Sequence, residues 1–121
     1  MTHVLRVVGF DLVGGEDLCR PLKDYIVPLL SFVERQKDEG VDIPFLFHAG
    51  ETLGDGTESD ENMYDAILLG TKRIGHGSGS NMFPMMMAYR FNAYRFSIVK
   101  HPRLMEICRE KGIALEVCPI S

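Results

Sequence analysis

The chain has 121 residues, enough for one modest domain with a hydrophobic core and too few for two. Its 45% hydrophobic and 25% charged residues are typical of a soluble globular protein. A formal net charge of −4 argues against a nucleic-acid partner, which would favour a clustered positive surface. No apolar run approaches the roughly 20 residues needed to span a bilayer, so we expect no membrane span.

Strands and helices are predicted to alternate along the chain. Residues 5–12 form a continuous β-rich run, and residues 25–37 have helical spacing with Gly40 as a stop. Pro28 falls early enough in that helix to be tolerated. Residues 44–48 read as a second strand, which a polar, glycine-rich loop follows.

The second half of the chain continues the alternation. Ser59 or Asp60 can cap a helix whose apolar face is predicted to hold Met63, Ala66, Ile67 and Gly70. Residues 73–76 form the third predicted strand and residues 113–117 the fourth. Between these two strands, a helix is expected to begin near Pro102 and to stop at Gly112.

This alternation indicates an α/β fold with parallel strands, for which a doubly wound sheet and a (β/α) barrel are both candidates. Polar residues and glycines follow several of the strands, among them Asp11, Gly14, His48, Glu51 and His76. In a barrel these strand ends meet on one rim, where active sites are built. A doubly wound sheet usually carries a glycine-rich phosphate loop, and no Gly-x-Gly-x-x-Gly opens a helix here. The sequence therefore favours the barrel.

Residues 78–95 interrupt the alternation with four methionines and four aromatic residues. If this segment is deleted, the third strand runs on into a compact βα unit, so we interpret it as an insertion on the rim. It is either a lid that contacts substrate or a segment without function, such as a retained in-frame intron or a tolerated surface insertion.

The strand ends offer the groups of a metal-assisted hydrolase. A neutral His48 imidazole is a good zinc ligand, and zinc makes a water nucleophilic near neutral pH. Glu51 could move a proton, and His76 could orient or deprotonate the water. Taken alone, His-x-x-Glu is a common pattern, and a histidine beside glycines is more often a structural hydrogen-bonding residue.

Four motifs in order make the pattern specific. The chain resembles the adenosine deaminase family of metal-dependent hydrolases in Gly9-Phe10-Asp11-Leu12-Val13-Gly14, His48-Ala49-Gly50-Glu51-Thr52, Arg73-Ile74-Gly75-His76-Gly77 and Glu116-Val117-Cys118-Pro119-Ile120-Ser121. Residues 10–17, Lys100-His101-Pro102 and Cys118-Pro119-Ile120-Ser121 look most like its secreted, growth-factor-related branch, the adenosine deaminase 2 branch. The resemblance covers nearly the whole chain except residues 78–95.

The resemblance implies a zinc-dependent hydrolytic deamination of adenosine or 2′-deoxyadenosine that releases ammonia. It implies His48 as a zinc ligand, Glu51 as the acid that protonates the purine ring, His76 as the residue that orients the attacking water, and Gly14 as a backbone contact to the purine. It further implies one Zn²⁺ per active site, a purine nucleoside as substrate and a homodimer as one arrangement of the full-length protein. An extracellular location follows from the branch. The absence of a signal-peptide pattern at the start of this chain leaves a cytoplasmic location open.

The chain also departs from the family. It contains neither the His-x-His nor the Asp-Asp pair that would supply further zinc ligands. We therefore expect residues 1–121 to be an adenosine deaminase-like domain that is incomplete at both ends. It would cover strands 4–7 of a (β/α)8 TIM barrel and would be inactive alone. The alternatives are a non-catalytic relative that binds nucleosides or acts in signalling, and a barrel amidohydrolase with another substrate.

Overall fold

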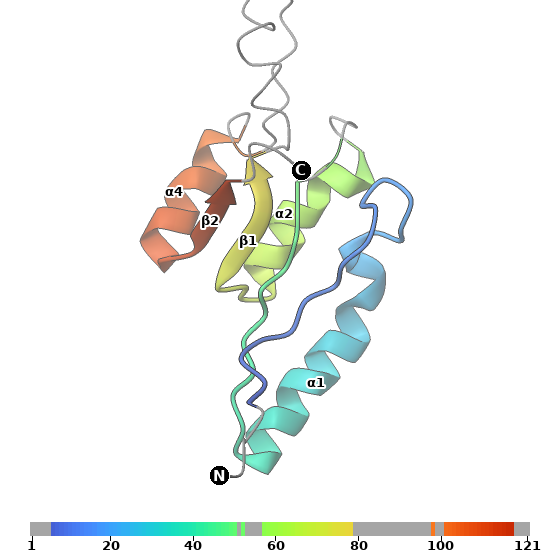
Figure 1. Ribbon diagram of the computed structural model, residues 1–121, viewed down its shortest axis with the longest axis vertical. Coiled ribbons are helices and arrows are strands. Elements are labelled where there is room, and N and C mark those ends of the chain that lie inside the picture. The colour runs from blue at the N-terminus through green and yellow to red at the C-terminus, as the bar shows by residue number, and fades with distance from the viewer. Residues whose placement is uncertain (1–5, 51, 53–56, 79–97, 99–100, 118–121) are drawn as a thin grey trace, which may run out of the picture.

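The computed structural model describes residues 6–50, 52, 57–78, 98 and 101–117 (Figure 1). Helices and strands are mixed, as expected for an α/β protein. In chain order the elements are the 3-10 helix η1 (Leu22–Tyr25), α1 (Ile26–Glu39), α2 (Glu58–Leu68), β1 (Arg73–Ser78), α4 (Pro102–Lys111) and β2 (Ala114–Val117). Apart from Ser78, the predicted insertion at 78–95 lies outside the described residues.

The strands and extended segments lie side by side in the order in which the chain visits them. β1 pairs with β2 in parallel, with Arg73 opposite Ala114. Isolated parallel bridges join Phe10 to Phe45 and His48 to Gly75. Among the described residues, the spatial order is therefore residues 6–12, residues 44–50, β1 and β2.

Within the first two predicted strands, 5–12 and 44–48, the described residues 6–12 and 44–48 are extended but do not form regular strands. Side chains take places that backbone groups would fill in a parallel ladder. The amide of Phe47 donates to Thr71 Oγ1 at 3.1 Å, and the amide of His48 donates to Asp11 Oδ1 at 3.0 Å. The prediction of regular strands was wrong here, because the pattern of apolar residues in the sequence does not reveal where a side chain replaces a backbone hydrogen-bonding group.

Two helices end where the sequence predicts. Gly40 follows α1 with φ 66° and Gly112 follows α4 with φ 64°, and both are left-handed conformations that glycine adopts readily. Pro102 is the first residue of α4, where its missing N–H costs no helical hydrogen bond.

Helix α2 differs from the prediction at both ends. Thr57, rather than Ser59 or Asp60, occupies the N-cap position, and the first turn holds the acidic side chains that favour a helix N-terminus. Met63, Ala66 and Ile67 are buried as expected. Gly70 lies beyond the helix with φ 81°, so it is a turn residue and not the fourth member of the apolar face.

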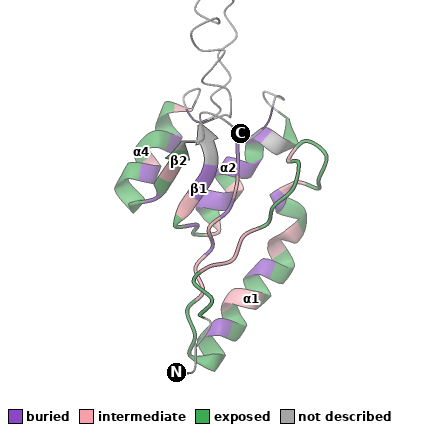
Figure 2. Cartoon of the chain, in the orientation of Figure 1, coloured by how far each residue is buried: buried purple, intermediate pink, exposed green. Residues whose placement is uncertain are grey.

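Buried residues lie on helices α1, α2 and α4 and on the extended segments between them (Figure 2). A single buried cluster joins Phe45, Phe47 and Ile74 of the extended segments with side chains of α1, α2 and α4. Phe45 and Phe47 stack with ring centroids 4.8 Å apart, and Phe10 contacts both rings. Because side chains alternate along extended chain, the residues between these positions face the other side.

None of the helices in the described part of the chain is long and apolar enough to cross a membrane.

Candidate functional site

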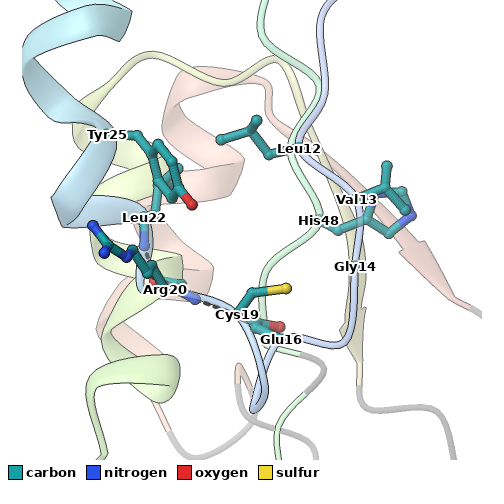
Figure 3. A pocket seen from close by; sticks show the side chains of 10 residues that line it. Leu12, Val13, Gly14, Glu16, Cys19, Arg20, Leu22, Tyr25 and His48 are labelled. Atoms are coloured by element: carbon teal, nitrogen blue, oxygen red, sulfur yellow. Dashed lines mark hydrogen bonds between the residues drawn. The ribbon is translucent and has the colours of Figure 1, made fainter.

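Two of the four predicted site residues, Gly14 and His48, line the same pocket (Figure 3). Gly14 lies in the loop after the first extended segment, and His48 lies near the end of the second. The backbone of His76 belongs to β1, but its side chain lies outside the described part. Glu51 also lies outside the described residues.

The pocket has a volume of about 160 Å³. Much of its wall is formed by Leu12, the last residue of the first extended segment, and by residues of the loop after it, including Val13, Glu16, Cys19 and Arg20. Leu22 and Tyr25 of η1, together with Asn62 of α2, complete the lining. Apolar and hydrogen-bonding side chains are thus combined, as in pockets that bind small organic molecules.

Asp11 holds His48 at two points, one on the ring and one on the backbone. Its Oδ2 lies 2.5 Å from His48 Nδ1, and its Oδ1 accepts the His48 backbone N–H at 3.0 Å. Because a carboxylate only accepts hydrogen bonds, the neutral ring carries its proton on Nδ1 and its lone pair on Nε2. His48 therefore presents Nε2 as the nitrogen suited to a metal or another acid.

This arrangement fits one zinc ligand. Metal-binding histidines usually donate their second ring N–H to a carboxylate or carbonyl, as His48 does to Asp11. Within the described residues, no group of three or more histidine, cysteine, aspartate or glutamate side chains could hold a metal ion. The described part of the chain thus offers His48 as a single candidate ligand.

Glycine at position 75 makes room for the His48 ring. A Cβ at this position would lie 2.8 Å from His48 Cδ2 and 2.9 Å from His48 Nε2. Any side chain here would have to displace the imidazole or the strand. The Arg-Ile-Gly-His-Gly motif therefore contributes more than the predicted histidine, because the lack of a side chain at Gly75 leaves room for the His48 ring.

Two acidic side chains bind the residues just before and just after Glu51 in the sequence. Glu16 Oε1 accepts the Gly50 N–H at 3.1 Å, and Thr52 Oγ1 donates to Asp17 Oδ1. Glu16 also accepts from Asn62 Nδ2 at 2.8 Å, which ties the loop to α2. Sequence reasoning assigned no role to these acids, although they stand in the segment that resembles the family.

The similarity of this chain to known proteins extends over nearly its whole length. A family model described as adenosine deaminase matches residues 4–121. Adenosine deaminase 2-A of Danio rerio is 42% identical over 115 residues, which are 95% of this chain and 18% of that protein. Adenosine deaminase 2 of Homo sapiens and the adenosine deaminase of Lutzomyia longipalpis are each 41% identical, with the same coverage of 95% and 18%. The chain thus spans less than a fifth of the length of the curated relatives it matches.

Proposed function

The chain belongs to the adenosine deaminase family, and we propose that it forms part of the active site of a zinc-dependent adenosine deaminase. The reaction is the hydrolytic deamination of adenosine or 2′-deoxyadenosine, which gives inosine or 2′-deoxyinosine and ammonia. The observation that carries this proposal is that His48 and Gly14 line one pocket, with His48 oriented by Asp11.

The roles proposed for the residues are those that the resemblance implies, and each has a chemical reason. His48 holds zinc through Nε2, and zinc when bound supplies an activated water at neutral pH. Glu51 protonates the purine ring nitrogen next to the amine-bearing carbon, which prepares that carbon for attack. His76 orients and deprotonates the water as its oxygen adds to this carbon. The Gly14 backbone positions the purine. His76 then passes the proton taken from the water to the amine, so that the C–N bond breaks and ammonia leaves, while the hydroxyl proton of the added oxygen returns to Glu51 as the carbonyl forms.

The fold supports this placement of the site. Parallel neighbours in unbroken chain order, with the helical core on one side, are what an arc of a (β/α)8 barrel requires. A doubly wound sheet would reverse its order at a switch point. We assign the four extended segments to strands 4–7 of the barrel, so that Gly14 and His48 stand at the active rim.

The remaining zinc ligands belong, in this proposal, to a longer polypeptide. The 121 residues hold neither a His-x-His nor an Asp-Asp pair, and one imidazole does not retain zinc tightly. The domain at 1–121 is accordingly one part of a catalytic domain. By the same resemblance, we place the full-length protein outside the cell as a homodimer.

The test is an assay of the longest polypeptide that carries this sequence. Purified with zinc, it should convert adenosine to inosine with one ammonia released per turnover. His48→Ala should remove zinc and activity together, whereas Glu51→Gln should remove activity and leave zinc in place. Arg103→Met is the control, because Arg103 lies exposed on α4 in an ion pair with Glu106.

Two outcomes would contradict the proposal. A folded polypeptide that binds adenosine without releasing ammonia would instead be a nucleoside-binding module. A zinc-containing polypeptide that hydrolyses a different amine or amide would be another kind of amidohydrolase.

A further inference from the structure

A row of charged and hydrogen-bonding side chains crosses all four extended segments on the face that points away from the hydrophobic core. It runs from Glu116 on β2 through Arg73 on β1 to Asp11 on the first segment, and it ends at His48 on the second. Alternation along the chain accounts for its position, since Ile74 and Phe47 beside these residues point into the core.

Arg73 is the centre of this row. Its Nη2 donates to Leu46 O at 2.7 Å and lies 3.3 Å from Asp11 Oδ2. Its Nη1 donates to Glu116 Oε2. One guanidinium thus joins three of its neighbours, which lie on three different segments, with the planar fork that suits arginine and not lysine.

We propose that Asp11 and Arg73 are positioning residues, which set the orientation and the tautomer of His48 for metal binding. Asp11 acts on His48 directly, and Arg73 acts through Asp11. The metal-binding part of this inference rests on the proposed function, whereas the orientation of the ring does not.

The two carboxylate oxygens of Asp11 accept hydrogen bonds from two groups of His48, its backbone N–H and its ring Nδ1–H, and this geometry restricts the ring. With the backbone N–H on Oδ1 and Nδ1 on Oδ2, the imidazole can neither flip nor move its proton to Nε2 without losing a bond. The Asp11 side chain is 20% exposed and that of Arg73 26%, so both charges are largely shielded from water. Their interaction is therefore less screened than that of a surface ion pair.

The first experiment replaces Asp11 in the full-length polypeptide. Asp11→Asn keeps the shape, but its amide can donate to Nδ1, which would move the ring proton to Nε2. The ¹⁵N shifts of the His48 ring in the metal-free protein should report this change of tautomer. Zinc affinity, measured by competition with a chelator, should fall about 10–100-fold, which is the usual loss when a carboxylate hydrogen-bonded to a histidine ligand is removed.

The second experiment removes the guanidinium of Arg73, which holds Asp11 in place. Arg73→Met should lower zinc affinity by roughly tenfold or less, because Asp11 remains but is held less firmly. Arg73→Lys should recover only part of that loss. If Arg73 acts through Asp11, the double variant Asp11→Asn with Arg73→Met should bind zinc no more weakly than Asp11→Asn alone. Arg103→Met, with the same loss of charge on an exposed helix, should leave zinc affinity unchanged.

Circular dichroism and thermal melting show whether each variant is folded, and Glu116→Gln provides a milder variant should Arg73→Met not fold. A folded Asp11→Asn variant that keeps the Nδ1–H tautomer and the parent zinc affinity would overturn the proposal. If the tautomer changes but the parent polypeptide neither binds zinc nor deaminates adenosine, the positioning role stands and the proposed function fails. Fully additive losses in the double variant would overturn the role of Arg73.

Discussion

The His48 imidazole is confined on two sides, by the Asp11 carboxylate and by the backbone of Gly75. Its side chain is 27% exposed, so solvent and small molecules reach it from the pocket that Gly14 also lines. A single added carbon at either neighbour is therefore expected to move the ring.

Gly75→Ala tests this confinement. The new Cβ would lie under 3 Å from the His48 ring and from Arg73 Nη1, so the strand or both side chains must shift. We expect a loss of stability of about 1–3 kcal/mol from overpacking and a clear loss of zinc affinity in the full-length polypeptide. Thermal denaturation and chelator competition measure the two effects.

Gly15→Ala is the matched control, because its Cβ would meet the nearest atom of Leu18 at an ordinary 3.5 Å. Equal losses in the two variants would show that the space above Gly75 has no special role.

Cys19 gives a chemical test of the pocket. Its side chain is exposed and lines the pocket beside Gly14, so a thiol reagent should modify it. Burial raises the pKa of the Cys108 thiol, which should therefore react slowly in the native protein. Adenosine should slow the modification of Cys19 in the full-length polypeptide, as measured by mass spectrometry. Unchanged labelling at saturating adenosine would place the nucleoside elsewhere.

Local sequence was sufficient to name His48 and Gly14 as candidates, because strand ends and short motifs are local features, and the two residues line one pocket. The contact of Asp11 with His48 was not predictable in this way, since the two residues are 37 positions apart and meet only because their segments are neighbours. Arg73 was missed for a similar reason. In sequence it is only the first residue of a strand, and its partners lie on three other segments.

At the scale of elements, a threonine side chain completes the pairing between residues 44–50 and the turn before β1. Thr71 Oγ1 accepts a hydrogen bond from the Phe47 N–H. The same hydroxyl lies 3.1 Å from Phe45 O and 2.6 Å from Arg73 O, and it can donate its single proton to one of these two oxygens. Thr71 is only 1% exposed, so water cannot replace the hydroxyl.

Thr71→Val should therefore destabilise the protein although the two side chains have nearly the same shape. The Phe47 N–H would be buried without its acceptor, which costs about 1–3 kcal/mol. Thr71→Ser keeps the hydroxyl and should lose less. Urea denaturation of both variants measures the difference, and equal stability of the valine variant and the parent would contradict this account.

The ends of α1 and α4 were predictable because each depends on one glycine and, in α4, one proline. The start of α2 was placed too late, since Ser59 and Asp60 are good caps by residue type but lie inside the helix. Asp60 is instead buried at 6% exposure, with His101 Nε2 3.4 Å from its Oδ2, a contact between α2 and the start of α4.

At the scale of the whole molecule, the row of extended segments has two outer edges that no other described segment covers. Residues 6–12 and β2 each have a neighbour on one side only within this part of the structure. Val7 and Val8, at 70% and 77% exposure, stand on the first of these edges. Exposed strand edges with apolar side chains favour pairing between chains.

The 121-residue chain expressed alone should accordingly be largely insoluble or oligomeric. Val8→Lys should shift the soluble fraction toward smaller species, because a charge on the edge opposes pairing. Sedimentation velocity and calorimetry test this prediction. A monodisperse monomer that melts cooperatively would show that the chain is stable without further strands.

The order of the segments also has a consequence for the speed of folding. The contacts that join neighbouring segments close loops of 24 residues from Phe47 to Thr71, 37 from Asp11 to His48 and 43 from Arg73 to Glu116. Loop-closure entropy rises by only about 0.6 kcal/mol per doubling of length, so no pair has a marked advantage as the nucleus. Every pairing is non-local, and chains with such contacts fold slowly. The residues that orient His48 come together only when these same long loops close, so the ring is positioned no earlier than the segments pair.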